Sequence, residues 1–359
     1  VLEPQIICRM FESPQNTYDI IIVGAGLSGI GTACHLQGLC PTKRFAILES
    51  RGAIGGTWDL FRYPGIRSDS DMHTLGYSFK PWLQAEAIAD GPSILQYVNE
   101  TAREHQITQH VLFKHRVVSA DWSSQFASWS LAVEVGAKPE VQYFRCNVLL
   151  MCGGYYDFDT AYDPRFTTLG RFGGTVAHPQ FWPENMEYRG KRVVVIGSGA
   201  TAMTIVPTMA QKGAMVTMVQ RSPTYVVSQP REDAIANFLG RWLPARWAYF
   251  LTRWKNIVRD LRFYRQTRIK PDKIKADLVG AVRDIMGPDY DVGTHFTPSY
   301  GPWDQRLCLI PDDDLFHTLK DGSAKVVTGL ITEFTPHGLK LGNGKQIDAT
   351  TVHKSNEGP

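Results

Sequence analysis

Two glycine-rich turns, each directly after a short apolar run, constrain the fold of this chain more than any other feature. The first turn follows the run over residues 18–23 and reads Gly-Ala-Gly-Leu-Ser-Gly. The second follows the run over residues 192–196 and reads Gly-Ser-Gly-Ala-Thr-Ala. A buried strand that leads through such a turn into a helix begins a dinucleotide-binding βαβ unit. The sequence therefore predicts an α/β protein with two Rossmann-like dinucleotide-binding domains.

In the first unit, each glycine of the turn has its own task. Gly24 permits the tight turn, Gly26 lets a phosphate approach the backbone, and Gly29 lets the helix pack on the strand. The helix that begins near Ser28 directs its N-terminus at the pyrophosphate. Glu49 follows Gly29 by 20 residues and ends the next predicted strand, where a carboxylate accepts hydrogen bonds from a ribose. This unit predicts a site for a dinucleotide without a 2′-phosphate, either FAD or NAD.

The second unit differs in the residues that follow its second strand. Six turn residues are predicted to contact its nucleotide: Gly197, Ser198, Gly199, Ala200, Thr201 and Ala202. The next predicted strand, over residues 215–219, is followed by Gln220 and Arg221, and we expect Arg221 at the position that Glu49 has in the first unit. A guanidinium pairs with a 2′-phosphate that a carboxylate would repel, so the pattern favours NADP over NAD. The alternative is a surface arginine without such a role.

The segment between the two units carries a longer pattern. Residues 172–183 read FGGTVAHPQFWP. They resemble the F-x-G-x-x-x-H-x-x-x-W-P fingerprint of the Baeyer–Villiger type of flavin-containing monooxygenases, and the matching residues are Phe172, Gly174, His178, Trp182 and Pro183. GGTW at residues 55–58 and RYPG at 62–65 match a second family signature. In detail the chain resembles the ethionamide-activating subgroup, through RYPGIRSDSD at residues 62–71 and WDQRLCL at 303–309.

This resemblance, over roughly residues 10–348, implies a cofactor pair and an activity. FAD would occupy the first unit and NADPH the second, and NADPH would pass a hydride to the flavin. The reduced flavin would add oxygen to give a flavin peroxide, which inserts oxygen into a ketone or oxygenates a sulfur or nitrogen compound. By the same resemblance Arg306 stabilises the peroxide anion, Asp69 orients Arg306, and His178 couples the linker to domain rotation. These three residues are the predicted catalytic set.

The resemblance also assigns further cofactor contacts. For FAD they are Gly56, Thr57, Trp58, Asp59, Leu60, Asp69 and Val117. For NADP they are Arg67, Ser68, Gln220 and Arg221 in addition to the turn. Judged alone, Trp58 would be assigned to plain core packing, and Arg67, Asp69 and Asp71 to a solvated charge cluster.

The expected domain boundaries follow from the same comparison. Residues 10–155 form the FAD domain, and residues 156–330 form the NADP domain with a helical insertion at about 231–300. In the family the chain then returns to the FAD domain with a strand that ends in Ala-Thr-Gly, so residues 331–359 are expected there as a truncated continuation. Met10 is a candidate natural start. The alternative function is a truncated, catalytically impaired FAD- and NADP-binding protein without turnover.

Residues 241–275, within the insertion, contain eleven Lys or Arg and two Asp. Apolar residues recur at helical spacing there: Phe250, Trp254, Ile257, Leu261 and Tyr264. We expect this stripe to pack on the core while the basic face is solvated. The alternative is peripheral membrane contact, with the segment lying on anionic lipid.

Composition excludes several other classes. The net charge of +3 is too small overall to indicate nucleic-acid binding. The six cysteines include no CxxC pair, which argues against a disulfide reductase and against a metal site, and they are expected as buried thiols of a reducing compartment. No apolar run approaches the ~18 residues that span a bilayer, and no signal peptide is recognisable. The expected location is cytoplasmic, with or without membrane association.

Overall fold

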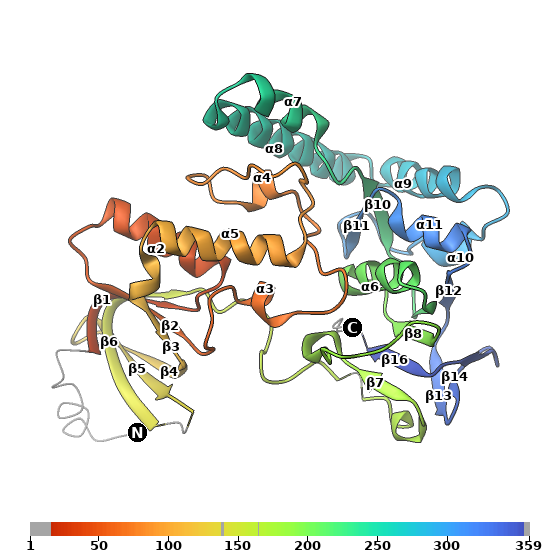
Figure 1. Ribbon diagram of the computed structural model, residues 1–359, viewed down its shortest axis with the longest axis horizontal. Helices are drawn as coiled ribbons and strands as arrows, with labels where there is room; N and C mark the ends of the chain where they lie inside the picture. Colours follow the sequence, from red (N-terminus) through yellow and green to blue (C-terminus); the bar gives the residue numbers. More distant parts are fainter. Residues whose placement is uncertain (1–15, 138–139, 164, 355–359) are drawn as a thin grey trace. The chain divides into compact units, whose positions relative to one another are not determined.

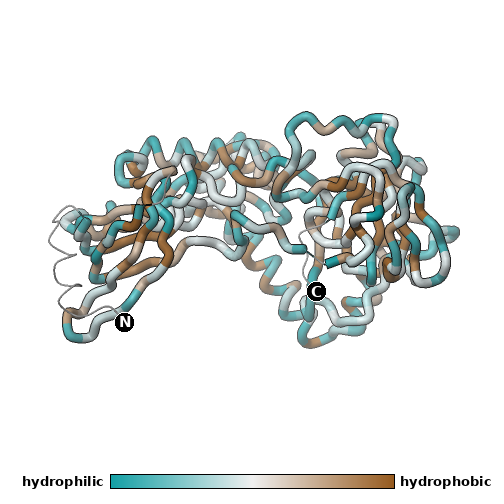
Figure 2. The backbone as a smooth tube through the Cα atoms, turned by 90° about the horizontal axis from the view of Figure 1, so that it is seen from below, coloured by the Kyte–Doolittle hydropathy of each residue, from teal (hydrophilic) through white to brown (hydrophobic). Residues whose placement is uncertain are grey.

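The protein, described here by a computed structural model over residues 16–137, 140–163 and 165–354, has two compact units (Figure 1). Of the described residues, one unit comprises 16–60 and 92–158, and the other comprises 61–91 and 159–354. Apolar residues are concentrated in the strands of each unit (Figure 2). The first boundary lies close to the expected residue 155. Residues 61–91, which were expected in the first domain, belong instead to the second unit.

The first unit is built on a six-stranded sheet with the order β3-β2-β1-β6-β5-β4. Its strands are β1 (Thr17–Val23), β2 (Phe45–Glu49), β3 (Val111–Phe113), β4 (His115–Ser123), β5 (Ser128–Val135) and β6 (Glu140–Met151). β1 pairs in parallel with β2 and β6, whereas β6 pairs antiparallel with β5 and β5 with β4. Because β1 lies between parallel neighbours, Ile21 and Ile22 at its centre are fully buried.

Helices connect these strands. They are α2 (Leu27–Leu39), α3 (Thr57–Leu60), α5 (Gly91–Glu104) and the 3₁₀ turn η2 (Ile107–His110). The hairpin β4–β5 packs against the central strands in one apolar cluster, which contains Ile21, Leu48, Leu131, Val133, Phe144 and Cys146. This cluster fixes the carboxyl ends of β1 and β2, where the first nucleotide site is expected.

The second unit is built on a five-stranded parallel sheet with the order β12-β9-β8-β16-β7. Its strands are β7 (Thr175–Ala177), β8 (Arg192–Ile196), β9 (Met215–Gln220), β12 (Ala324–Thr328) and β16 (Thr351–Lys354). Its helices include α4 (Met72–Leu75), α6 (Ala200–Gln211), α11 (Asp314–Lys320) and the 3₁₀ turns η3 (Leu169–Arg171) and η4 (Pro179–Phe181).

A helical insertion lies between β10 (Tyr225–Gln229) and β11 (Leu307–Pro311), which form a separate parallel pair. It consists of α7 (Ala234–Trp242), α8 (Ala245–Ile269), α9 (Pro271–Met286) and α10 (Val292–Phe296). These four helices lie within residues 231–300, the region predicted to be a helical insertion.

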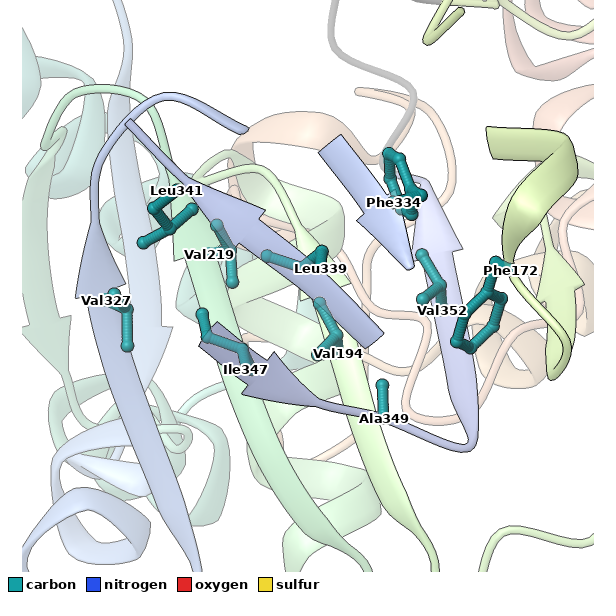
Figure 3. Packing of buried hydrophobic residues seen from close by; sticks show 10 residues of the cluster. All are labelled: Phe172, Val194, Val219, Val327, Phe334, Leu339, Leu341, Ile347, Ala349 and Val352. Carbon is teal, nitrogen blue, oxygen red and sulfur yellow. The ribbon is translucent and has the colours of Figure 1, made fainter. Parts of the chain in front are cut away.

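The C-terminal segment corrects the prediction that residues 331–359 return to the first domain. β13 (Ile331–Thr335), β14 (Gly338–Leu341) and β15 (Gln346–Asp348) form an antiparallel sheet, and β16 then pairs with β8 and β7 of the second unit. This repeats the first unit, where antiparallel strands lead into β6 beside β1. The physical cause is burial, because Val352 of β16 packs with Val194 and Phe172 in the core of the second unit (Figure 3).

The aromatic stripe of α8 also differs from the prediction. Phe250, Trp254, Leu261 and Tyr264 are 49%, 53%, 62% and 51% exposed, so they do not pack on the core. The buried face of α8 is instead formed by Ala248, Tyr249, Thr252, Asn256 and Thr267. This face lies against α4 and α7. Polar residues occur on it because acceptors in and beside α4 receive hydrogen bonds from α8, namely the Tyr77 carbonyl from Tyr249 and the Asp71 carboxylate from Asn256.

Candidate functional site: two nucleotide turns and a charged loop

The first glycine turn joins β1 to α2. Gly24 has a φ of 101°, and its N–H donates to the Leu48 carbonyl over 2.8 Å. A Cβ on Gly24 would lie 2.6 Å from the Cys152 carbonyl oxygen, and one on Gly29 would lie 1.9 Å from the Gly24 carbonyl oxygen. Gly26 caps α2 without a side-chain hydrogen bond, so the first N–H groups of the helix stay available to an anion. The turn has the shape that a bound pyrophosphate requires.

The loop after β2 packs against this turn. The Gly55 N–H donates to the Ala25 carbonyl over 3.1 Å, and a Cβ on Gly56 would lie only 3.1 Å from the Gly26 Cα. The Arg51 guanidinium donates to the Gly56 carbonyl over 3.1 Å and to the Asp59 carboxylate over 2.6 Å. Asp59 therefore holds the loop in place. The other predicted FAD contacts of this region have exposed or half-buried side chains, and they are Ser28, Thr57, Trp58 and Leu60.

Glu49 lies at the end of β2 and is only 3% exposed. Its carboxylate accepts the Ala25 N–H over 2.7 Å and the Arg51 N–H over 2.8 Å, one on each oxygen. Each oxygen can accept a second hydrogen bond, so a ribose hydroxyl can still bind. The glycine turn and this carboxylate together fit the adenosine diphosphate half of FAD. Val117, the predicted adenine neighbour, is half-buried in β4 against the apolar cluster of the first unit.

The second turn repeats the geometry of the first. Gly197 has a φ of 123°, and its N–H donates to the Val219 carbonyl over 2.8 Å. Gly199 caps α6 with extended backbone and no side-chain hydrogen bond. The Ser198 hydroxyl donates to the Ser222 carbonyl over 3.3 Å, which ties the turn to the segment after β9. Of the remaining predicted contacts, Ala200 is exposed, and Thr201 and Ala202 are buried within α6.

The backbone hydrogen bonds of the two turns decide which residue corresponds to Glu49. In the first unit the turn glycine binds the residue before Glu49, and in the second it binds Val219, the residue before Gln220. Gln220 therefore takes the Glu49 position, and the expectation that Arg221 does so is wrong. The cause is that β9 extends one residue further than predicted and ends at Gln220.

Gln220 and Arg221 have different surroundings. Gln220 is 1% exposed, and its amide donates to the His295 carbonyl over 2.8 Å and to the Thr328 hydroxyl over 2.9 Å. Arg221 is exposed directly after it. A neutral amide at the ribose position does not repel a 2′-phosphate, and an exposed guanidinium is next to it. The pair fits NADP through two adjacent residues.

The loop over residues 67–71 belongs to the second unit and holds a buried ion pair. The Arg67 guanidinium donates to the Asp314 carboxylate over 2.5 Å and to the Met203 carbonyl over 3.3 Å. Side-chain exposure is 7% for Arg67 and 12% for Asp314. Burial raises the pKa of Asp314 above its usual value, while the Arg67 charge opposes that shift. Arg67 thus joins the loop to α6 and α11, and sequence reasoning missed Asp314 because the two residues lie far apart in the chain.

Three further polar residues of the loop have separate roles. The Ser68 hydroxyl donates to the Ser70 carbonyl over 2.7 Å and stays buried. Asp71 caps α4 by accepting the Thr74 N–H over 3.0 Å. Asp69 is exposed between them. Of the two aspartates, Asp69 is the exposed one, and its predicted role of orienting Arg306 stays a prediction.

Arg306 lies directly before β11, and its side chain is exposed. Its carbonyl accepts hydrogen bonds from the Thr224 hydroxyl over 3.2 Å and from the Tyr300 hydroxyl over 2.9 Å. The backbone that carries the guanidinium is therefore fixed at the end of the β10–β11 pair. The pairing of Arg306 with Asp69 stays a prediction.

The fingerprint residues gather around β7 and β16. A Cβ on Gly174 would lie 2.4 Å from the Thr350 carbonyl oxygen, and Trp182 stacks on His353 with ring centroids 4.6 Å apart. The His178 Nδ1 accepts the Gln180 N–H over 3.2 Å at the start of η4. Burial, together with the positive charge of Lys354, lowers the pKa of His178 to about 4. These contacts give His178 a structural place in the linker, and its coupling to domain rotation stays a prediction.

Within residues 16–137, 140–163 and 165–354, no helix has the length and apolarity needed to cross a membrane. Within the same ranges, His, Cys, Asp and Glu side chains do not gather in a group that could hold a metal ion.

Residues 84–265 match the flavin-binding monooxygenase-like family model, and residues 22–86 match the NAD(P)-binding Rossmann-like domain model. The chain is 49% identical to the FAD-containing monooxygenase EthA of Mycobacterium tuberculosis (strain H37Rv) over 335 residues. The matched residues cover 93% of this chain and 68% of EthA. The chain belongs to this family of flavin-binding monooxygenases. The resemblance drawn from the fingerprint and the RYPGIRSDSD segment is thereby confirmed.

Other relatives agree with this membership. The probable FAD-binding monooxygenase AlmA of Acinetobacter baylyi is 46% identical over 335 residues, which are 93% of this chain and 67% of AlmA. Among solved structures, an oxidised steroid monooxygenase bound to NADP superimposes with a TM-score of 0.76 at 20% identity, over 94% of this chain and 70% of that one. OTEMO with FAD and NADP gives 0.74 at 21%, over 94% and 71%. These structural likenesses confirm the two-domain α/β fold.

Proposed function

We infer that this flavin-binding monooxygenase family member is an FAD-dependent, NADPH-consuming monooxygenase of the Baeyer–Villiger type. The observation that carries this inference is the repeated turn geometry. One chain holds two glycine turns with matching hydrogen bonds, the first followed by buried Glu49 and the second by Gln220 and Arg221. A carboxylate selects an unphosphorylated ribose, and an amide with a guanidinium suits a 2′-phosphate. The substrate class is a small organic ketone or a sulfur or nitrogen compound, with molecular oxygen as co-substrate.

Each set of residues has a part in this activity. The N-terminus of α2 binds the FAD pyrophosphate and Glu49 its ribose, while the N-terminus of α6 and Arg221 bind NADPH. When bound, FAD accepts a hydride from NADPH and activates dioxygen. Asp69 orients the Arg306 guanidinium, whose positive charge stabilises the anion that develops during oxygen transfer. Two hydrogen bonds to the Arg306 carbonyl hold the backbone that carries this side chain in place.

The test uses purified full chain supplied with FAD. Flavin absorbance after desalting reports binding, and NADPH oxidation is followed with a panel of ketones and thioethers under ¹⁸O₂. We expect esters or sulfoxides that carry one labelled oxygen. Retained flavin with neither substrate-dependent NADPH oxidation nor labelled product from any panel member would favour the alternative of a nucleotide-binding protein without turnover. The monooxygenase relatives named above support the main interpretation over that alternative.

We also propose that α8 contacts an anionic lipid surface. Six exposed apolar residues follow one face of this helix at spacings of three and four residues: Trp247, Phe250, Leu251, Trp254, Val258 and Leu261. Residues 241–275 carry eleven basic and two acidic residues, which complements anionic headgroups. Sedimentation with vesicles of neutral lipid, with and without anionic lipid, tests this. Trp254→Ala should weaken binding to anionic vesicles several-fold, and equal sedimentation with neutral vesicles would contradict the proposal.

A further inference from the structure

A pocket of about 610 Å³ lies in the second unit, and the glycine turn of that unit does not line it. Its walls come from α4 and the following loop, and from α7 and α8. Binding pockets for small organic molecules typically have volumes of about 300–1,000 Å³. The monooxygenase roles assigned above do not use its lining residues.

His73 lines this pocket and is 5% exposed. Within the described residues, neither ring nitrogen of His73 has a hydrogen-bond partner. A buried polar group without a partner is costly and calls for one that is not part of the chain. Burial lowers the pKa of His73, which keeps the ring neutral near pH 7, with one donor and one acceptor nitrogen.

The backbone around His73 is held firmly. The Arg253 guanidinium donates to the His73 carbonyl over 2.8 Å and to the Tyr249 hydroxyl over the same distance. The Tyr249 ring lies 6.4 Å from the His73 ring. The backbone that carries the imidazole is therefore fixed, which lowers the entropy cost of binding a ligand.

The polar groups of the two aromatic side chains that line the pocket, Trp82 and Tyr249, already have hydrogen-bond partners in the protein. Trp82 donates its indole N–H to the Glu86 carbonyl over 2.9 Å, and Tyr249 donates its hydroxyl to the Tyr77 carbonyl over 3.1 Å. Their rings, with Leu83 and small residues such as Ala236, form the apolar part of the wall, and the uncharged polar side chains of Gln84, Asn237 and Thr252 line the rest. The charged lining residues Glu232 and Arg241 have opposite signs and are exposed. The pocket thus suits a ligand without net charge.

We propose that this pocket binds an uncharged aromatic or alicyclic molecule whose single hydroxyl group forms a hydrogen bond with His73. The rings of Trp82 and Tyr249 contact the body of the ligand, and His73 recognises its polar group. The binding step is non-covalent and does not depend on the proposed monooxygenase activity.

The test compares two probes of similar size, 2-naphthol and 2-methylnaphthalene. Their binding to full chain loaded with FAD and NADP⁺ is measured by equilibrium dialysis with fluorescence detection at pH 7. We expect the wild-type protein to bind 2-naphthol about tenfold more tightly than 2-methylnaphthalene, because only 2-naphthol has a hydroxyl group that can form a hydrogen bond with a ring nitrogen of His73. His73→Phe should remove this preference and leave the affinity for 2-methylnaphthalene within about twofold.

A second variant blocks the pocket without relying on His73. Gly240 of α7 lines the pocket, and a Cβ there meets nothing within 4 Å, so Gly240→Leu should fold and fill part of the space. Gly280 of α9 is a matched control, because its Cβ also meets nothing and it lies outside the pocket. Gly240→Leu should weaken both probes at least tenfold, and Gly280→Leu should change neither. Equal binding of both probes by the wild type, or equal behaviour of the two leucine variants, would overturn the proposal.

Discussion

Single residues distinguish the two nucleotide sites. Glu49 and Gln220 hold the same position in their units, and both are buried. The Glu49 carboxylate and the Gln220 amide nitrogen are hydrogen-bonded to the protein, whereas the Gln220 Oε1 has no partner within the described residues. What differs is charge, together with the exposed Arg221 that follows Gln220. We propose that this change of a carboxylate to an amide sets which ribose each site accepts, while the strand and turn around it stay the same.

Arg221→Ala should lower NADPH affinity by about one to two powers of ten, because a charge-assisted pair contributes roughly 1.5–3 kcal/mol. NADH affinity should change less than twofold. Stopped-flow reduction of the flavin at varied cofactor concentration gives both values. Arg171→Ala, which removes an exposed arginine paired with Glu333, is the control and should affect neither cofactor. Equal losses for NADPH and NADH would refute the role of Arg221.

His353 makes stability depend on pH. It is fully buried, and burial lowers its pKa to about 4 from an ordinary 6.5. As pH falls, the unfolded chain therefore takes up a proton at this histidine before the folded protein does. The contribution of His353 to the free energy of unfolding is complete above pH 6.5 and is lost as pH falls toward about 4. The loss should not exceed about 1.4 kcal/mol per pH unit from this group.

Urea unfolding at pH 7.5 and pH 5 tests this dependence. His353→Phe should have a smaller decrease in unfolding free energy between the two pH values than the wild type. His35→Phe, at a position in α2 of the first unit, serves as the comparison and should keep the wild-type decrease. An unchanged decrease in His353→Phe would show that other groups cause the acid sensitivity.

At the scale of elements, buried contacts join segments that are distant in sequence. The Arg67–Asp314 pair ties the loop before α4 to α11, and Arg67 also reaches the Met203 carbonyl of α6. Gly65 lets the same loop approach α6 closely, because a Cβ at this position would lie only 2.0 Å from the Thr208 hydroxyl of α6. This packing explains why residues 61–91 belong to the second unit.

Arg67→Met should destabilise the second unit by about 3–5 kcal/mol, since it leaves the Asp314 carboxylate buried without its partner. The double variant with Asp314→Asn should recover part of this loss. Arg171→Met is the matched control, because its pair with Glu333 is 64% and 41% exposed and should contribute about 0–1 kcal/mol. Urea unfolding gives the free energy of unfolding of each variant and of the single variant Asp314→Asn, which the double variant needs for comparison. Additive losses in the double variant would mean that the two side chains do not interact.

At the scale of the whole molecule, the proposed reaction needs both nucleotide units and the arginine before β11. NADPH consumption depends on the two turns, whereas oxygen transfer depends on the charge of Arg306. The two activities can therefore be separated by one substitution that leaves both turns intact.

Arg306→Ala should keep NADPH-dependent flavin reduction within about twofold but lower product formation by about 10²–10³-fold, the usual loss when a charge-stabilising donor is removed. Anaerobic reduction and aerobic product yield are measured on the same preparation. Arg262→Ala, at an exposed position in α8, should match the wild type in both assays. Normal product yield in Arg306→Ala would end its assignment as a catalytic residue.

The sequence alone determined the parts of this protein that depend on local backbone geometry. Gly24, Gly26 and Gly29 are required by a turn within six residues, so their spacing predicts the strand, the turn and the helix together. The repeat of this pattern predicted the second unit, and the fingerprint around His178 predicted the family. The insertion was also predictable, because its helical periodicity is continuous over many residues.

Only the tertiary structure decided the features that depend on partners far along the chain. Arg67 and Asp314 are 247 residues apart, and β16 joins β8 through hydrogen bonds that no local pattern specifies. Periodicity places the aromatic stripe on one face of α8 but does not determine whether that face meets the core or the solvent. The register of β9, which puts Gln220 at the Glu49 position, likewise follows from pairing between strands, because each strand's end is set by its neighbours.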